Sequence, residues 1–237
     1  MPQGADFKAD LPTPPAGAEW AAPAKVIDRL VYRFDGVGYL KGYKHLFVVP
    51  SEGGTARQLT SGRFNFASYR GGQTVWSQDS KYIYASTNLQ DDWEANIESD
   101  IYQINAADGS MDQLTDRNGP DGNPTPSPDG KHLAYTGFDD KKMARQISHI
   151  YVMNLKTKKI REIKTKLDRG VSNLSWSGDG KNIIFTYDNK GNTKLAKTTL
   201  NGKTKILANN AGGSYGMSYA GVSYLSLIHI SEPTRLG

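Results

Sequence analysis

The sequence contains no cysteine among its 237 residues. Disulfide bridges, thiolate zinc sites and a cysteine nucleophile are therefore excluded. Histidine is scarce as well, with four in the chain, and no His-Glu-x-x-His or comparable ligand spacing accompanies them. We read His45, His132 and His149 as structural residues at strand starts, and we expect neither a metal site nor a cofactor.

A long apolar run is also missing, so the sequence has no candidate for a membrane-spanning helix. Residues 1–24 are rich in Pro and Ala and lack the basic and then apolar pattern of a signal peptide, so we read them as a connector. Hydrophobic residues make up 37% of the chain and charged residues 22%, with 25 glycines and 13 tyrosines. This composition is typical of a soluble, turn-rich, all-β protein, and it leaves the cellular compartment undetermined.

The net charge of +5 can be traced to one short segment. Residues 156–166 hold six basic side chains against Glu162, so the rest of the chain sums to zero. Lysines on an outer β-strand commonly prevent edge-to-edge pairing, whereas a nucleic-acid binder presents a broader basic face. We therefore expect no nucleic acid among the partners, and the lack of a long apolar run leads us to expect no membrane either. The six basic residues are Lys156, Lys158, Lys159, Arg161, Lys164 and Lys166.

The last thirteen residues break the pattern of the preceding chain. Residues 225–235 match, at all eleven codons, the frame translation of a common transposon-type sequencing adapter. We expect residues 225–237 to be an adapter-derived, non-native tail and exclude them from fold reasoning. The native continuation would then be missing.

An internal repeat dominates the rest of the sequence. Residues 75–81, 125–131 and 175–181 align without gaps at a period of 50, and each is followed by a run typical of a β-strand. The Asp-Gly or Asp-Ser pair in each segment favours a tight turn, so each copy predicts a β-hairpin. Trp76, Pro126 and Trp176 should occupy equivalent places.

A second hairpin follows in each repeat, and two hairpins make the four strands of one propeller blade. We predict full blades at residues 74–115, 125–163 and 173–207, preceded by an outer hairpin at 45–60. A further inner strand is predicted around residues 214–224. The fold class is thus all-β, a partial and open β-propeller of four-stranded blades over residues 25–224. The strand residues Ile83, Leu133 and Ile183 should be buried between blades.

The Trp-Ser-x-Asp-Gly-Lys repeat resembles the propeller repeats shared by TolB and the prolyl oligopeptidase family. Longer strings, over about residues 18 to 224, resemble the acylaminoacyl-peptidase and dipeptidyl-peptidase V branch of that family. The resemblance implies a propeller of about six to eight blades that caps an α/β-hydrolase domain with a Ser, Asp, His triad. That domain would follow the adapter junction, and a blade or two would precede Met1. The strings are residues 25–39, 45–50, 57–62, 114–122 and 134–140.

Catalytic motifs are lacking. Residues 216–220 approach the Gly-x-Ser-x-Gly elbow of a serine hydrolase but end in Ala220, and we read them as a strand. Residues 36–41 fail the dinucleotide-binding pattern at its last position. Residues 116–122 faintly resemble a calcium loop, but Pro120 stands at a ligand position, so we read a plain turn between blades.

One loop remains as a candidate site. Residues 88–99 hold four carboxylates and Trp93, unlike the equivalent loops. Carboxylates beside an aromatic surface suit the α-ammonium group of a peptide, so Asp92, Trp93 and Glu94 are candidate substrate-binding residues. The alternative is a solvated acidic loop.

The sequence therefore favours a noncatalytic propeller that gates oligopeptide access to a missing C-terminal α/β-hydrolase domain. The alternative is a TolB-like propeller that binds a protein partner.

Overall fold

The computed structural model describes residues 15–18, 25–66 and 74–212. Within these residues the regular structure is β-strand, joined by turns and loops, and no helix of membrane-spanning length occurs there. The predicted strand at 214–224 and the tail at 225–237 lie outside the described residues, as does most of the connector at 1–24.

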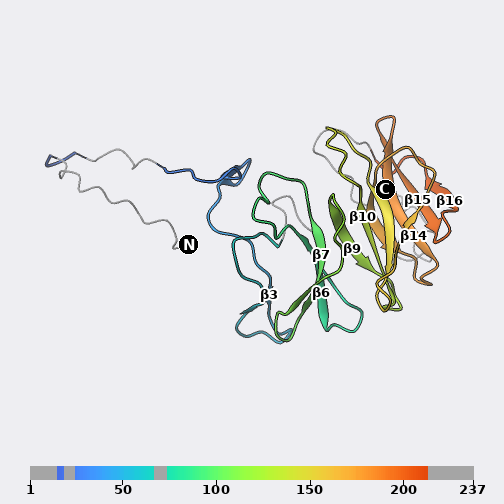
Figure 1. Cartoon of the computed structure of the whole chain (residues 1–237), viewed down its shortest axis with the longest axis horizontal. Coiled ribbons are helices and arrows are strands. Elements are labelled where there is room, and N and C mark those ends of the chain that lie inside the picture. The colour runs from blue at the N-terminus through green and yellow to red at the C-terminus, as the bar shows by residue number, and fades with distance from the viewer. Residues whose placement is uncertain (1–14, 19–24, 67–73, 213–237) are drawn as a thin grey trace, which may run out of the picture.

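Three antiparallel sheets of four strands follow one another along the chain, each in simple sequence order (Figure 1). We call them blades 1, 2 and 3. Two shorter hairpins precede them. Blade 1 consists of β5 (Val75–Trp76), β6 (Tyr82–Thr87), β7 (Asp100–Asn105) and β8 (Met111–Gln113). Blade 2 consists of β9 (Asp121–Pro126), β10 (His132–Gly137), β11 (His149–Asn154) and β12 (Ile160–Ile163). Blade 3 consists of β13 (Val171–Trp176), β14 (Asn182–Asn189), β15 (Asn192–Thr199) and β16 (Thr204–Ala208). The short hairpins are β1 (Arg33–Phe34) with β2 (Gly38–Tyr39), and β3 (Phe47–Val48) with β4 (Arg57–Gln58).

The repeated turn has the same hydrogen bonds in every blade. In blade 2 the Ser127 hydroxyl donates to Asp129 at 2.6 Å, the Lys131 backbone N–H donates to the same carboxylate oxygen at 3.1 Å, and the His132 N–H donates to Ser127 Oγ at 2.9 Å. These bonds hold the pKa of Asp129 below its usual value, with the Ser127 bond as the largest cause. Gly130 then adopts a left-handed φ of 67°, which explains the Asp-Gly pair.

The predicted register and burial are confirmed. Trp76 pairs with Ile83, Pro126 with Leu133 and Trp176 with Ile183, so the three repeats place equivalent residues on equivalent strands. Relative exposure is 6% for Ile83 and 0% for Leu133 and Ile183. These residues belong to three apolar clusters, two of which join side chains of neighbouring blades.

The inner strands of blades 2 and 3 begin earlier than predicted, at Asp121 and Val171. Each contains a shift in pairing register, and Asn123 and Asn173 have left-handed φ values of 54° and 52°. A bulge of this kind interrupts the alternation of apolar and polar residues, so the sequence pattern hides the first part of the strand. The outer hairpin predicted at 45–60 forms shorter strands, β3 and β4.

The first inter-blade contact is incomplete in the described part of the chain. In blade 3 the Trp176 indole N–H donates to Thr125 O of blade 2 at 2.9 Å, and its ring lies 6.4 Å from that of His132. Trp76, its equivalent in blade 1, is 48% exposed. The sheet before it is the two-stranded β3–β4 pair, so no described inner strand covers this tryptophan. The three blades therefore form an open arc rather than a closed ring (Figure 1).

Candidate functional site

The long loops lie on one side of the blades. Because the four strands of a blade alternate in direction, the β6–β7 and β10–β11 loops leave the same edge as the connectors between blades. The short Ser-x-Asp turns occupy the opposite edge. Residues 88–99 and 138–148 form the long loops of blades 1 and 2, whereas in blade 3 only Lys190 and Gly191 separate β14 from β15. We call this edge the loop face.

The three predicted site residues lie together in the loop of blade 1. Backbone turns from Trp93 N–H to Gln90 O at 3.2 Å and from Ala95 N–H to Asp92 O at 2.8 Å shape this segment. Asp92 is exposed, and Trp93 and Glu94 are half-buried. All three line a hollow of about 510 Å³ that the sequence did not reveal, because its other wall comes from residues 28–30, 43 and 63–64.

Three of the loop carboxylates accept hydrogen bonds from other groups of the same chain. Glu94 Oε2 accepts the Leu30 N–H at 3.0 Å, Asp92 Oδ1 accepts the Asn96 side-chain amide at 2.8 Å, and Glu98 Oε2 accepts the Gly119 N–H at 2.7 Å. The mutual repulsion that favours an external cation is therefore weaker than the sequence indicates. Glu94 Oε1 differs, because this atom is buried and has no hydrogen-bond partner among the described residues.

The wall opposite the loop is aromatic and cationic. The Trp93 ring meets Tyr43 edge-on at 6.3 Å between centroids, and the Arg29 guanidinium lies 5.6 Å from the centre of the Tyr43 ring. Arg63 lies beside Tyr43 and close to Glu94, and the Tyr43 hydroxyl is the main cause of its raised pKa. Four carboxylates and two arginines line the hollow, so its net charge is −2. Such a lining suits a ligand with an ammonium group and neighbouring carbonyl oxygens.

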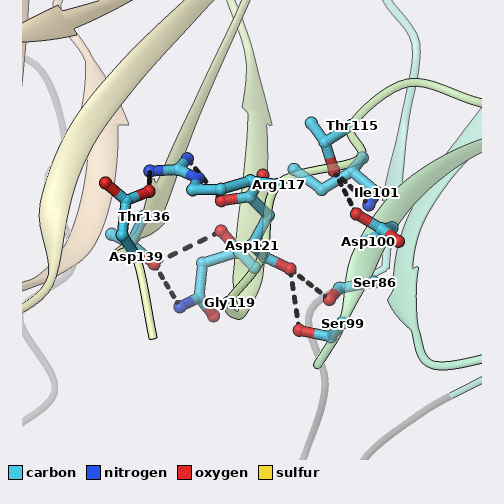
Figure 2. A network of polar contacts seen from close by, with 12 residues as sticks. Ser86, Ser99, Asp100, Ile101, Thr115, Arg117, Gly119, Asp121, Thr136 and Asp139 are labelled. Carbon is cyan, nitrogen blue, oxygen red and sulfur yellow. Dashed lines mark hydrogen bonds and ion pairs between the residues drawn. The ribbon is translucent and has the colours of Figure 1, made fainter. Parts of the chain in front are cut away.

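A hydrogen-bonded seam fixes the loop to blade 2 (Figure 2). The Asp121 N–H donates to Ser99 O at 2.7 Å, and Asp121 O accepts the hydroxyls of Ser86 at 2.6 Å and Ser99 at 3.1 Å. Together with the Glu98 contact to Gly119, these bonds join the end of the loop to the first residues of β9. The loop is therefore anchored at its C-terminal end by the neighbouring blade.

The same seam contains a buried ion pair. Arg117 and Asp121 approach to 2.6 Å, with side-chain exposures of 17% and 1%, and Arg117 stacks 3.7 Å above the Tyr151 ring. Burial is the main cause that raises the pKa of Asp121 to about 6, against the opposing effect of Arg117. Burial also raises the pKa of Asp100 to about 6. Thr115 donates to Asp100 at 3.2 Å from the same seam.

The sequence reading of residues 116–122 as a plain turn missed this pair. A signal was present in the repeat, since Arg117 and Asp121 align at a spacing of 50 with Leu167 and Val171 of blade 3. Val171 is buried, and Leu167 packs on the same apolar cluster. Two opposite charges in place of two apolar core residues indicate a paired, buried contact.

The described residues contain no group of three His, Asp or Glu side chains placed to hold a metal ion. His45 Nδ1 lies 3.4 Å from Thr60 Oγ1, but this hydroxyl is buried and accepts the Leu46 N–H at 2.9 Å. That contact is therefore structural. The described lining of the hollow at the loop face presents charged, aromatic and hydrogen-bonding groups.

No family model matches this chain. Among curated proteins, the Tol-Pal system protein TolB of Francisella tularensis is 28% identical over 150 residues, which cover 61% of this chain and 31% of TolB. Dipeptidyl-peptidase 5 of Porphyromonas gingivalis is 29% identical over 130 residues, which cover 53% of this chain and 19% of the peptidase. The matched segment thus spans less than a third of either relative.

Solved structures share the fold. A putative TolB from Agrobacterium tumefaciens superimposes with a TM-score of 0.52 at 18% identity, covering 69% of this chain and 56% of that one. An oligogalacturonate lyase in complex with manganese superimposes with a TM-score of 0.52 at 16% identity, and the match covers 75% of this chain and 45% of the lyase. A puromycin hydrolase superimposes with a TM-score of 0.50 at 11% identity, and the match covers 68% of this chain and 23% of the hydrolase. The chain therefore has a TolB-like β-propeller fold, and its repeats are similar in sequence to segments of TolB and of dipeptidyl-peptidase 5.

Proposed function

We propose that this chain is the noncatalytic propeller part of a serine peptidase, and that its loop face governs which oligopeptides reach an α/β-hydrolase domain outside this sequence. The observation that carries the proposal is the 29% identity to dipeptidyl-peptidase 5 over 130 residues. The restriction of long loops to one face of blades 1 and 2 supports it, because recognition commonly lies on loops that a rigid scaffold positions.

Within this proposal, Asp92 and Glu94 meet the α-ammonium group of the substrate. The buried Glu94 Oε1 without a partner among the described residues is the acceptor that such a group would use. Trp93 and Tyr43 supply an apolar wall beside it, and the net negative lining favours the cation. The competing interpretation, a solvated acidic loop, draws support from the internal hydrogen bonds of Asp92, Glu94 and Glu98.

Steady-state kinetics of the full-length protein that contains this chain tests the role of the loop. Glu94→Gln keeps an oxygen for the Leu30 N–H but removes the charge, and Asp92→Asn does the same toward Asn96. Loss of one charge-assisted hydrogen bond costs about 1.5 to 3 kcal/mol, or roughly ten- to a hundredfold in kcat/KM. We expect KM to rise for substrates with a free α-amino group and to stay nearly unchanged for their N-acylated analogues.

The matched control is Asp112→Asn, which neutralises an exposed carboxylate on β8 at the outer edge of blade 1. Asp112→Asn should leave KM unchanged for both substrate classes. If both classes respond equally to Glu94→Gln, or neither responds, the loop is solvated surface.

A TolB-like protein-binding module is the second candidate function, and it is favoured by the 28% identity to TolB over 150 residues. A fluorophosphonate probe separates the two, because it labels only a serine that is activated as a nucleophile. Labelling of the full-length protein supports the peptidase. An unlabelled, folded full-length protein contradicts it and favours the binding module.

A further inference from the structure

The charge of this protein is divided sharply along the chain. Residues 156–212 contain thirteen basic side chains against four acidic ones, a net charge of +9. The preceding 155 residues carry fifteen basic and nineteen acidic side chains, a net charge of −4. The basic region is therefore wider than the single strand pair identified from the sequence.

The structure joins two parts of this region into one surface. The β15–β16 turn packs against the connector that follows β12: the Thr204 hydroxyl lies 3.4 Å from Thr165 O, and Gly202 lies against Lys164 O so closely that a Cβ would not fit. The connector after β12, the outer strand of blade 2, thus contacts the turn that leads into β16, the outer strand of blade 3 (Figure 1). We call the exposed basic residues of these two edges the basic strip. Its members are Lys156, Lys158, Lys159, Arg161, Lys164, Lys166, Lys203 and Lys205.

Edge protection alone does not explain the basic strip. Strand β8 holds the same outer position in blade 1 and carries Met111, Asp112 and Gln113, without a single lysine. An edge in this fold therefore does not require several cations. Within the strip, no side chain forms an ion pair with a described residue. Eight exposed cations that form no ion pair with the described part of the chain favour a surface that meets an external anion.

The composition of the surface distinguishes between polyanions. Eleven of the thirteen basic residues in 156–212 are lysines, whereas nucleic-acid sites favour the forked geometry of arginine. The three aromatic residues of this segment, Trp176, Phe185 and Tyr187, are buried, so none of them can stack on a base. Beside the lysines, however, aliphatic side chains are exposed. They are Ile206 and Leu207 of β16, with relative exposures of 43% and 39%.

We propose that the basic strip, with Ile206 and Leu207, is a docking surface for an anionic phospholipid bilayer. Lysines attract anionic headgroups, and neighbouring aliphatic side chains enter the boundary between headgroups and acyl chains. This inference departs from the expectation of no membrane partner, which rested on the lack of a membrane-spanning segment and did not consider docking at the surface of a bilayer. It is independent of the proposed peptidase role.

Vesicle co-sedimentation of the purified chain tests the proposal. The chain should sediment with phosphatidylcholine vesicles that contain phosphatidylglycerol and stay in solution with phosphatidylcholine alone, and binding should weaken as salt is raised. The triple variant Lys159→Glu, Lys164→Glu, Lys205→Glu should bind about a hundredfold more weakly. The matched control is the triple variant Lys41→Glu, Lys81→Glu, Lys141→Glu, which makes the same change in net charge at exposed lysines outside the strip. This control should bind the anionic vesicles far more tightly than the triple variant within the strip.

A fourth variant, Ile206→Ser, separates lipid from nucleic acid, since it should weaken vesicle binding and leave any binding to duplex DNA unchanged. Absence of binding to anionic vesicles would overturn the proposal. So would equal loss in the two triple variants, because net charge alone would then explain the attraction. Tighter binding of duplex DNA through the strip lysines, with no effect of Ile206→Ser on vesicles, would assign the surface to nucleic acid instead.

Discussion

The buried pair of Arg117 and Asp121 leads to a prediction for a double variant. At the equivalent positions of blade 3 the chain has two apolar residues, Leu167 and Val171, in place of the ion pair. Removing Asp121 alone leaves the Arg117 guanidinium, 17% exposed, without its main partner. Breaking a buried ion pair in this way costs about 3 to 5 kcal/mol. We expect the loss of stability in Asp121→Val to lie at the lower end of this range, since the Asp139 carboxylate lies 3.8 Å from the Arg117 guanidinium and can partly replace the lost partner.

Replacing both partners should cost little. The pKa of Asp121 is raised to about 6 even beside Arg117, so burial of the carboxylate outweighs the attraction of its partner. A rise of roughly two units over the ordinary value corresponds to about 3 kcal/mol that opposes ionisation in the folded state near neutral pH. Arg117→Leu combined with Asp121→Val should therefore be within about 1 kcal/mol of the parent, or more stable.

Urea unfolding of the parent, both single variants and the double variant, followed by circular dichroism, measures the coupling energy. The reasoning is refuted if the double variant is as unstable as Asp121→Val alone, or if that single change is neutral.

The same series has a pH signature. A carboxyl whose pKa is raised from 3.8 to about 6 on folding binds more protons in the folded state between these values, so the free energy of unfolding should decline from about pH 4 to pH 6. Asp100, with a pKa of about 6 and with Glu98 and Asp116 nearby, adds a second contribution. In the double variant, the decline in the free energy of unfolding between pH 4 and pH 6 should keep the contribution of Asp100 and lose that of Asp121. A parent whose stability rises with pH over this range would contradict the assignment.

Three further outcomes follow from the fold. Ser80 occupies the left-handed turn position at φ 58° that Gly130 and Gly180 fill in the other blades, so Ser80→Gly should stabilise the chain by about 0.5 to 1 kcal/mol in urea unfolding, and Gly180→Ser should cost a similar amount. Gly137→Ala would bring a Cβ against Asp121 and within 2.8 Å of Pro120 O, so it should lower the unfolding temperature clearly, whereas Gly178→Ala meets nothing within 4 Å and should not. Trp76→Phe should remove more acrylamide-quenchable fluorescence than Trp176→Phe, since the exposures are 48% and 6%; equal losses would mean that the open side of blade 1 is covered.

The blades were predictable because their signals are local. Each Ser-x-Asp turn closes its own hydrogen bonds within six residues, as Ser127, Asp129 and His132 show. The strand that follows each turn is a short run of residues that is buried along most of its length. The early starts of β9 and β13 were not predictable from such local signals, since left-handed Asn123 and Asn173 shift the pairing register inside each strand.

The site was predictable only in part. Asp92, Trp93 and Glu94 were found from their composition, but their surroundings depend on contacts between distant segments, such as Glu94 with Leu30, which are 64 residues apart. Sequence composition gives no information on such partners, so it overstated the unsatisfied negative charge of the loop. It likewise treated residues 116–122 as a turn, although comparison with Leu167 and Val171 could have marked the buried pair.

The most direct test of the central claim, that this propeller serves a serine peptidase, is to sequence the source locus. We expect from the sequence match that residues 225–237 are adapter-derived, so that the native reading frame departs from this sequence after residue 224. We predict on the order of 250 further residues that contain Gly-x-Ser-x-Gly, then an Asp, then a His, in the order of an α/β-hydrolase triad. A frame that ends after completing the propeller, with no such motif, would contradict the peptidase assignment and leave the TolB-like binding module in its place.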